Sequence, residues 1–153
     1  MNTLKVSRSF KASQAALWQA WTEPEHFKQW YGPTGFSIPT CEIDFQVGGR
    51  HLWSMASPDG MEMFYTGEYK EISAMDRIIY SDAMADAEGN LMDPASMGMP
   101  AGTPASMDVT VTFEHSDGET TVTVSHMASG PDDPAAMGWK MAFDKLEAAL
   151  AVS

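Results

Sequence analysis

His126 is the polar side chain of this sequence with the most evident chemical potential. It shares the alternating phase of Val122 and Val124, so a strand through these residues directs the imidazole to the same side as two apolar side chains. A neutral imidazole in such surroundings could hydrogen-bond a ligand or act as a base near pH 7. It could equally be a core histidine whose hydrogen bonds are satisfied within the protein. Both interpretations remain open from the sequence alone.

The sequence contains no recognisable metal-binding, nucleotide-binding or nucleophile motif. Its single cysteine, Cys41, has no Cys or His at a ligand spacing, so no zinc pattern is present. The paired glycines Gly48 and Gly49 belong to a hairpin turn and do not form a phosphate-binding loop. His51 shares the phase of Trp53 but follows this turn directly, so we expect it to be exposed. We therefore predict no metal, no cofactor and no catalytic residue, which favours a protein that is not an enzyme.

Aromatic and methionine side chains could together line a cavity for a small apolar molecule. They occur in phase on two consecutive predicted strands, on the predicted C-terminal helix, and in the segment after the second short helix. Pockets for apolar ligands are lined by such residues with a few polar anchors, for which His126 and Tyr65 are the candidates. The same side chains could instead pack against one another as a solid core. The predicted ligand-binding residues are Trp30, Phe36, Trp53, Met55, Met63, Tyr65, His126, Trp139 and Phe143.

The elements that position these residues are organised around a helix predicted from Asp133 to Leu150. Asp133 can cap its first turn, and Pro134 suits the first helical position. Apolar side chains recur at helical spacing and form one stripe, namely Trp139, Phe143, Leu146 and Leu150. We expect the first two residues of this stripe to form a wall of the cavity and the last two to seal its far end.

Alternating patterns elsewhere predict mainly antiparallel strands. Thr22 and Glu25 match a capping box, and Gly67 within a strand predicts a bulge or a bend. The expected order is a strand at 3–11, short helices at 14–21 and 22–30, and strands at 37–47, 51–55, 61–72, 76–84, 107–115 and 119–127. The stretch 85–106 is rich in proline and glycine, so we expect a long loop, whose Met92, Met97 and Met99 could make it a lid.

This order predicts an α+β fold. Successive strands with short connections form an antiparallel sheet of about six to seven strands, which would wrap around the long C-terminal helix. Two short helices follow the first strand. At 153 residues, the chain is expected to form a single domain over 1–153, with enough surface buried on folding for a real core.

Composition limits the classes of partner. The formal net charge is −12, and the nine Lys and Arg residues are scattered, so binding of nucleic acid is not expected. No apolar run is long enough for a membrane span, and the first residues lack the apolar core of a signal peptide. With one cysteine, no internal disulfide can form. We therefore expect a cytoplasmic protein.

Local motifs spread along nearly the whole chain occur in a recognisable series. They are Phe10 with Ala12, Leu17-Trp18, Ala20-Trp21, Thr22-Glu23-Pro24-Glu25, Trp30-Tyr31-Gly32-Pro33, Asp44 with Gly48-Gly49-Arg50, Gly67-Glu68-Tyr69 with Glu71-Ile72, and Gly138-Trp139 with Leu146. In this order they resemble the activator of heat-shock protein 90 ATPase homologue family of the C-terminal-domain type. That family belongs to the START-like, birch-pollen-allergen-like superfamily, also called SRPBCC. Gln46 departs from the pattern, because the family commonly has an arginine before the paired glycines.

The resemblance implies a helix-grip fold with a cavity between the sheet and the C-terminal helix. Our first hypothesis is therefore non-enzymatic binding of a small hydrophobic or aromatic ligand by a monomer or weak dimer. The second is a co-chaperone or stress-response interaction module, although this chain has no room for the separate N-terminal domain of the eukaryotic co-chaperones. The third is a polyketide-cyclase-like enzyme, which would have to use His126 and either Tyr65 or Tyr80.

Overall fold

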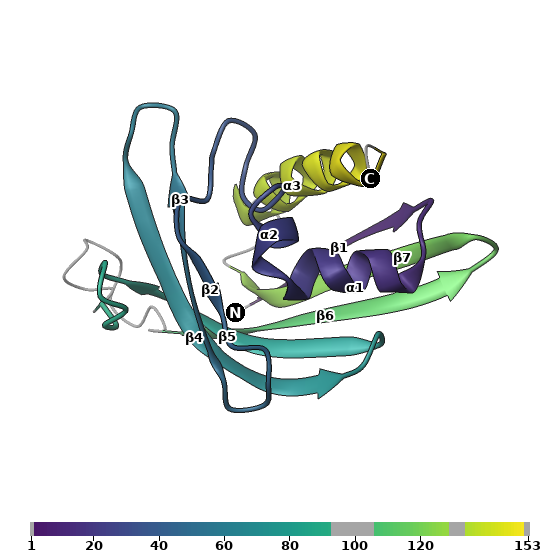
Figure 1. Ribbon diagram of the computed structural model, residues 1–153, viewed down its shortest axis with the longest axis horizontal. Helices are drawn as coiled ribbons and strands as arrows, with labels where there is room; N and C mark the ends of the chain where they lie inside the picture. Colours follow the sequence, from purple (N-terminus) through teal and green to yellow (C-terminus); the bar gives the residue numbers. More distant parts are fainter. Residues whose placement is uncertain (1, 93–105, 129–133, 152–153) are drawn as a thin grey trace.

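The helices and strands follow one another in the order expected from the sequence (Figure 1). The structure is a computed structural model that describes residues 2–92, 106–128 and 134–151. Within these ranges the elements are β1 (Asn2–Phe10), α1 (Gln14–Thr22), α2 (Pro24–Phe27), β2 (Cys41–Ile43), β3 (Arg50–Ala56), β4 (Glu62–Ser73), β5 (Arg77–Ala85), β6 (Met107–Ser116), β7 (Glu119–Ala128) and α3 (Pro134–Ala151). Most predicted bounds are confirmed to within a few residues.

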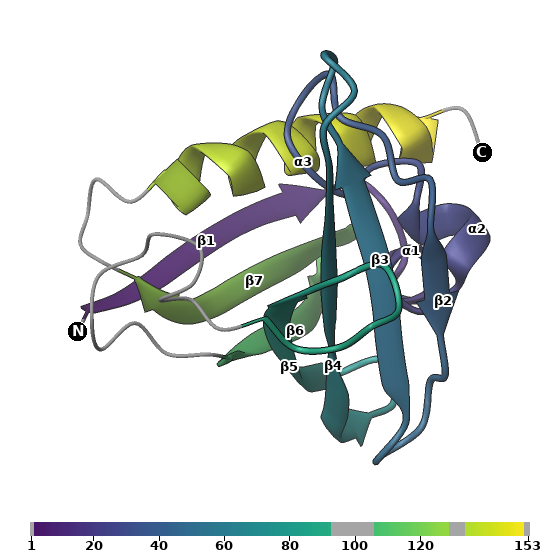
Figure 2. The same cartoon turned by 90° about the vertical axis from the view of Figure 1, so that its left-hand side faces the viewer.

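The strands form one antiparallel sheet in the order β1-β7-β6-β5-β4-β3-β2. Successive strands from β2 to β7 are neighbours, and β1 pairs with β7 from Asn2↔Ala128 to Phe10↔Thr120. The sheet is strongly twisted, so that β3 and β4 cross the direction of β1 and β7, and α3 lies against the concave side (Figure 2). The predicted α+β architecture, a sheet wrapped around a C-terminal helix, is confirmed.

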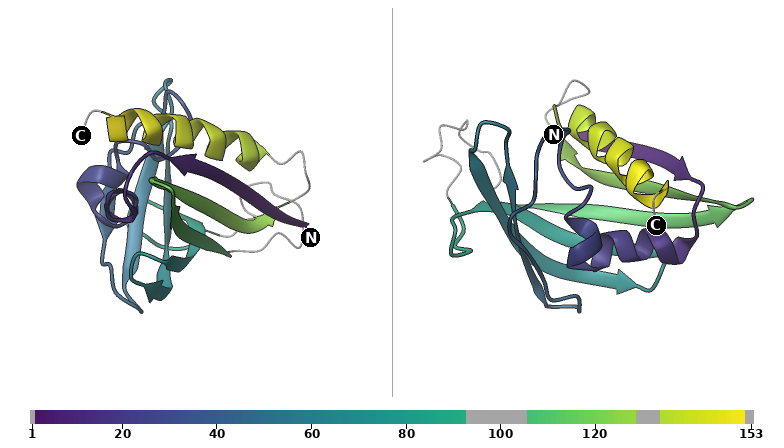
Figure 3. Two further views of the ribbon diagram at one scale, coloured as in Figure 1. Left: turned by 90° about the vertical axis from the view of Figure 1, so that its right-hand side faces the viewer. Right: turned by 45° about the horizontal axis from the view of Figure 1, so that its top comes forward.

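The C-terminal helix α3 buries the apolar stripe that its sequence predicts. Trp139, Phe143 and Leu146 are buried, and the Phe143 ring meets the Phe10 ring edge to face with centroids 5.7 Å apart. α1 and α2 lie beside the C-terminal part of α3 (Figure 3). The helix begins at Pro134 as expected, whereas the predicted cap, Asp133, lies outside the described residues.

The two short helices begin in different ways. Ser13 caps α1 as expected, because its hydroxyl accepts a hydrogen bond from the backbone N–H of Ala16 at 3.1 Å. The predicted capping box of the second helix is wrong. Thr22 is the last residue of α1, and the N-cap of α2 is Glu23, whose side chain makes no capping hydrogen bond. α1 therefore runs almost directly into α2, which ends at Phe27, earlier than predicted.

The segment 37–47 forms a much shorter strand than its alternation predicts. Only Cys41–Ile43 pairs as β2, and the chain then turns, since Gly49 N–H donates to Gln46 O at 2.8 Å. Val47 is 65% exposed within this turn and does not share a buried face with the residues before it. The residues after Ile43 alternate as in a strand, but in the structure they form this turn.

Part of the expected loop 85–106 lies within the described residues. Between Asp86 and Asn90 the chain makes a compact turn, in which an Asp86 carboxylate oxygen accepts from the backbone N–H of Asn90 at 2.9 Å. Met97 and Met99, on which the expectation of a lid partly rested, lie outside the described residues. The lid therefore stays a prediction.

Gly67 on β4 allows a close approach to the backbone of β5. A Cβ atom at this position would overlap the carbonyl oxygen of Ser81 on β5 and would lie 2.9 Å from Nε2 of His51. His51 is the register partner of Gly67 on β3, so its ring occupies the space that the glycine leaves open. The register between β4 and β5 shifts two residues later, between Tyr69 and Glu71. The predicted irregularity near Gly67 is thus present.

Replacing Gly67 by alanine should lower the free energy of unfolding by about 3 kcal/mol, because the added Cβ must push β4 away from β5 and displace His51. Urea denaturation followed by tryptophan fluorescence measures this change. Gly138→Ala on α3 is the matched control, since its Cβ would approach nothing closer than Pro33 Cγ at 3.9 Å. Alanine within a helix should stabilise the protein by about 0.5–1 kcal/mol. Equal losses in the two variants would contradict the role of the close approach.

Candidate functional site

A cavity of about 350 Å³ lies between α3 and the concave face of the sheet. Its wall combines residues of α3, of five strands and of the segment between α2 and β2. Most are apolar or aromatic, and they leave few polar groups facing the space. The lining residues are Tyr31, Gly32, Pro33, Met55, Tyr65, Asp82, Met107, Val109, His126, Ala135, Gly138, Trp139 and Ala142.

Asp82 supplies the carboxyl group of this cavity. It follows Tyr80 by two residues on β5, so both side chains point to the concave face. The Asp82 side chain is 11% exposed, and Oδ1 has no hydrogen-bond partner among the described residues. Burial raises the pKa of Asp82 to about 8, an effect that a hydrogen bond from the Ala83 backbone partly offsets. At pH 7 the group is therefore mostly a neutral acid facing an apolar space.

His51 lies beside Asp82 and is 1% exposed, so the expectation that it would be exposed is wrong. The missing Cβ of Gly67 makes room for its ring, which stacks on Trp53 with centroids 3.8 Å apart. His51 Nε2 lies 2.8 Å from the carbonyl oxygen of Ser81, and because a carbonyl only accepts, Nε2 carries the proton. Among the described residues Nδ1 has no partner.

His51 and Asp82 do not form a pair of opposite charges. Burial lowers the pKa of His51 to about 4, so the ring is neutral at pH 7. Its Nε2 is 4.0 Å from Oδ1 of Asp82, which is too long for a hydrogen bond. The carboxyl group therefore has a neutral neighbour and no counter-ion, and it belongs to a residue that lines the cavity.

Tyr31 and Tyr65 complete the polar part of the lining. Burial raises the pKa of both tyrosines, to about 12 for Tyr65, and the nearby Asp82 adds to the shift. Their hydroxyls remain protonated at physiological pH. The cavity thus contains hydroxyl groups and one carboxyl group, and none of its described lining residues is a lysine or an arginine.

His126 is a buried histidine with both ring nitrogens in use. Trp139 Nε1 donates to His126 Nε2 at 2.9 Å, and an indole N–H can only donate, so Nε2 must be the unprotonated nitrogen. Nδ1 then carries the proton and donates to the carbonyl oxygen of Met127 at 2.7 Å. His126 lines the cavity, but neither nitrogen is free to anchor a ligand or to act as the base of a cyclase-like reaction.

The remaining predicted site residues divide between the cavity and its surroundings. Met55, Tyr65, His126 and Trp139 line the cavity. Trp30, Trp53 and Phe143 do not, because they are fully buried in the core around it. Phe36 and Met63 also lie outside the lining, and Met63 is 37% exposed. Whether any of the nine binds a ligand stays a prediction.

Asp82 is not among the site residues predicted from the sequence, although a signal was present. On β5 the alternate residues Ile78 and Tyr80 are buried on the concave face, and the same phase continues to Asp82. A carboxylate in the buried phase of a strand is unusual enough to mark a candidate site. The part of the lining between α2 and β2 had no such signal, because its position depends on contacts made with α3.

Lys145 on α3 fixes the segment that forms one side of the cavity. Its Nζ lies 3.2 Å from the carbonyl oxygens of Tyr31 and Pro33 and 3.5 Å from that of Phe36. An ammonium group has three N–H donors, so all three contacts can be made at once. Partial burial lowers the pKa of Lys145. The segment with Tyr31, Gly32 and Pro33 is thereby held against the helix.

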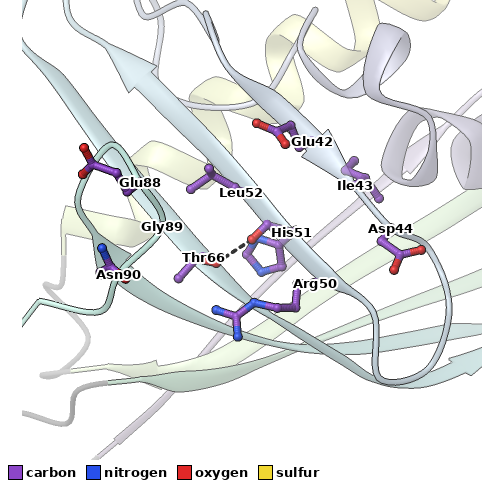
Figure 4. A pocket seen from close by; sticks show the side chains of 10 residues that line it. All are labelled: Glu42, Ile43, Asp44, Arg50, His51, Leu52, Thr66, Glu88, Gly89 and Asn90. Atoms are coloured by element: carbon purple, nitrogen blue, oxygen red, sulfur yellow. Dashed lines mark hydrogen bonds between the residues drawn. The ribbon is translucent and has the colours of Figure 1, made fainter.

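A second hollow, of about 550 Å³, lies on the other face of the sheet (Figure 4). Leu52 and Thr66 line it, one residue out of phase with the inward-facing Trp53 and Tyr65. Its charged residues, Glu42, Asp44, Arg50 and Glu88, are all exposed. Within the described ranges no group of three or more His, Cys, Asp or Glu residues is arranged to hold a metal ion. We therefore take the concave cavity as the candidate site.

An antiparallel sheet curved around a C-terminal helix, with a cavity between the two, defines the helix-grip class of proteins. The family model described as Activator of Hsp90 ATPase homolog 1-like protein (AHSA1) matches residues 11–151. The chain therefore belongs to this family, and the resemblance noted in the sequence is confirmed. Among the described residues, no helix is both long and apolar enough to span a bilayer.

Solved structures of bacterial proteins share this fold over almost their whole length. A protein from Chromobacterium violaceum has 23% identity and a TM-score of 0.78, with 96% of this chain and 95% of that chain covered. A protein from Staphylococcus epidermidis has 26% identity and a TM-score of 0.77, with 99% and 90% covered. The AHSA1 protein from Silicibacter pomeroyi has 20% identity and a TM-score of 0.76, with 99% of each chain covered. No curated protein matches the sequence significantly.

Asp82→Asn should remove a pH-dependent loss of stability. The pKa of Asp82 is about 8 in the folded protein and about 4 in an unfolded chain, so between these values folding binds a proton. The free energy of unfolding therefore falls as the pH rises. His51, with a folded pKa of about 4 and an unfolded pKa of about 6.5, has the opposite effect below pH 6.5. The net decline should appear between about pH 6.5 and 8.

Urea denaturation at a series of pH values across this window measures the decline. The wild-type protein should lose up to about 1 kcal/mol per pH unit relative to Asp82→Asn. Asp108→Asn is the control, because Asp108 is exposed on the neighbouring strand and its removal should leave the wild-type slope unchanged. Parallel profiles for wild type and Asp82→Asn would contradict the protonated, buried carboxyl group.

Proposed function

We propose that this protein binds a small hydrophobic or aromatic molecule, without chemical conversion, in the cavity between α3 and the sheet. The observation that carries the proposal is the cavity of about 350 Å³ with a mainly apolar lining and a few convergent polar groups. Ligand pockets have this character, and this volume lies near the lower end of their range of about 300–1,000 Å³. A molecule with one or two rings is therefore the expected size of ligand.

Several features support binding over a solid core. Small residues, Gly138 and Ala142, face the space from α3, where larger apolar side chains would have filled it. Met55 and Met107 add flexible, polarizable side chains that can adapt to an aromatic ligand. The surrounding core is densely aromatic, so the cavity is not the result of generally loose packing.

The family match favours one other candidate, contact with a chaperone of the heat-shock protein 90 class. The acidic chain, with a net charge of −12, would then meet a basic surface, and the affinity would fall as salt is added. A pull-down with the purified chaperone at low and at high salt tests this candidate. Failure to bind at low salt would exclude it and would leave the proposal of ligand binding unaffected.

Filling the cavity should abolish binding of an apolar probe. Gly138→Leu projects a side chain into the space, so we expect the affinity for N-phenyl-1-naphthylamine, a neutral fluorescent probe, to fall at least about tenfold. Met137→Leu is the matched control, because Met137 is the preceding residue of α3 and is 57% exposed. Probe fluorescence titrations measure both affinities. If the wild-type protein does not bind the probe saturably, or if both variants bind equally, the proposed site is wrong.

The two ends of the apolar stripe on α3 should differ in their effect on binding. Trp139→Ala removes a lining residue and the donor to His126, so it should weaken both probe binding and stability, the latter by about 3 kcal/mol or more. Leu150 lies outside the cavity lining, so Leu150→Ala should affect stability alone. Titration and denaturation of each variant separate the two effects. Equal losses of binding would argue against a cavity wall at Trp139.

A further inference from the structure

The charged groups available in the cavity are of one kind, because its described lining includes a carboxyl group and no lysine or arginine. Oδ1 of Asp82 is buried, has no partner among the described residues, and belongs to a residue that lines the cavity. None of the described lining residues is a lysine or an arginine. The two internal stretches that lie outside the described ranges, 93–105 and 129–133, also contain neither residue. The carboxyl group is thus left for a ligand to satisfy.

We propose that the ligand is an apolar molecule with one basic nitrogen, and that the protonated nitrogen donates a hydrogen bond to the carboxylate of Asp82. This inference rests on the proposed function and specifies the class of ligand. An ionised donor and acceptor form a stronger hydrogen bond than a neutral pair, and the pair gains further in a site that excludes water. A lipophilic amine meets both requirements of the cavity, its apolar volume and its carboxyl group.

The residues around Asp82 cannot take the place of this cation. His51 already donates its Nε2 proton to Ser81 O, and the ring is 4.0 Å from the carboxyl oxygen. Lys145 of α3 is held by the carbonyl oxygens of Tyr31, Pro33 and Phe36 and does not line the cavity. No side chain in the described part of the lining therefore supplies the positive charge that a charged Asp82 needs.

The same geometry disfavours anionic ligands such as fatty acids. A carboxylate in this cavity would face Asp82 and the phenols of Tyr31 and Tyr65, with no lining lysine or arginine to pair with. The electrostatic field of the whole protein also disfavours anions, because the chain carries a net charge of −12 and attracts cations. Aromatic lining residues also suit a cation, since a ring face attracts positive charge.

Binding of a protonated amine should release a proton. The free protein holds Asp82 largely as the neutral acid at pH 7, whereas the complex requires the carboxylate. The proton on Asp82 passes to the buffer, and the ammonium keeps its own. Tyr31, Tyr65, Tyr69, Tyr80 and His51 face Asp82 and do not change charge near pH 7, because burial raises the pKa of the tyrosines and lowers that of the histidine. Affinity should therefore tighten as the pH rises from 6 to 8, by up to about tenfold per pH unit.

The test compares two probes of the same shape. One is N,N-dimethyl-1-naphthylmethylamine, which is protonated at pH 7, and the other is 1-isobutylnaphthalene, in which a CH group replaces the nitrogen. Calorimetric titration of the wild-type protein should give at least about tenfold tighter binding of the amine, one charge-assisted hydrogen bond being worth about that much. Titrations in buffers with different ionisation enthalpies measure the released proton.

Two variants locate the effect. Asp82→Asn should bind both probes with equal affinity, without proton release and without pH dependence. Asp108→Asn makes the same substitution at an exposed carboxyl group next to the cavity-lining Met107 and Val109 and should retain the preference for the amine. If the wild-type protein binds the two probes equally, or if Asp82→Asn keeps the preference, the inference is wrong and the proposed function stands. If neither probe binds and the neutral fluorescent probe also fails, the proposed function is wrong as well.

Discussion

The close approach of β4 and β5 at Gly67 is the constraint on which the interior of this protein depends. Because Gly67 has no side chain, the ring of His51 can lie across it and donate to the carbonyl of Ser81. That ring in turn supports the stack with Trp53 and the edge contact with Tyr80. Asp82 follows Ser81 directly on the same strand, so its side chain lies on the concave face, where the nearest oxygen is 4.0 Å from His51 Nε2. A single missing methyl group thus shapes both the core and the cavity.

At Asp82, burial in an apolar interior conflicts with the need of a carboxyl group for hydrogen-bond partners. Burying a carboxyl group without a partner is costly, and the protein reduces this cost by keeping the group protonated. Its neighbours do not relieve the conflict, since His51 is neutral and the tyrosines keep their protons. Some interior polar atoms are paired, as the contact between Trp139 and His126 shows, whereas the indole nitrogens of Trp21 and Trp53 are buried without a partner among the described residues. An unsatisfied ionisable group in a well-packed interior is a feature typical of functional sites, and Asp82 is the one of these residues that also lines the cavity.

Local periodicity explains what the sequence could predict. The stripe of α3 and the alternation on β6 and β7 depend on neighbours within one element, and the structure contains them as expected. His51 was assigned wrongly because its burial depends on a glycine of the adjacent strand, which alternation within β3 cannot reveal. The predictions for the turn after β2 and for the junction of α1 with α2 were wrong for a similar reason. Local hydrogen bonds that alternation and capping patterns do not reveal determine the backbone conformation there. Which aromatic rings face the cavity and which fill the core depends on side-chain volumes that meet only in the folded protein.

The pairing of the first strand with the last has a consequence for how the chain acquires its structure. Ser7 on β1 is 116 residues from Thr123, its partner on β7. Contacts that join distant parts of a chain form late and slow the folding rate, because the intervening chain must lose entropy before they are gained. During synthesis β1 emerges first but has to wait for β7, and α3 follows later still. We therefore expect the nascent chain to expose the edge of β6 and its apolar concave face until β7 and α3 have been synthesised, which makes the preceding interval the period of greatest exposure to aggregation.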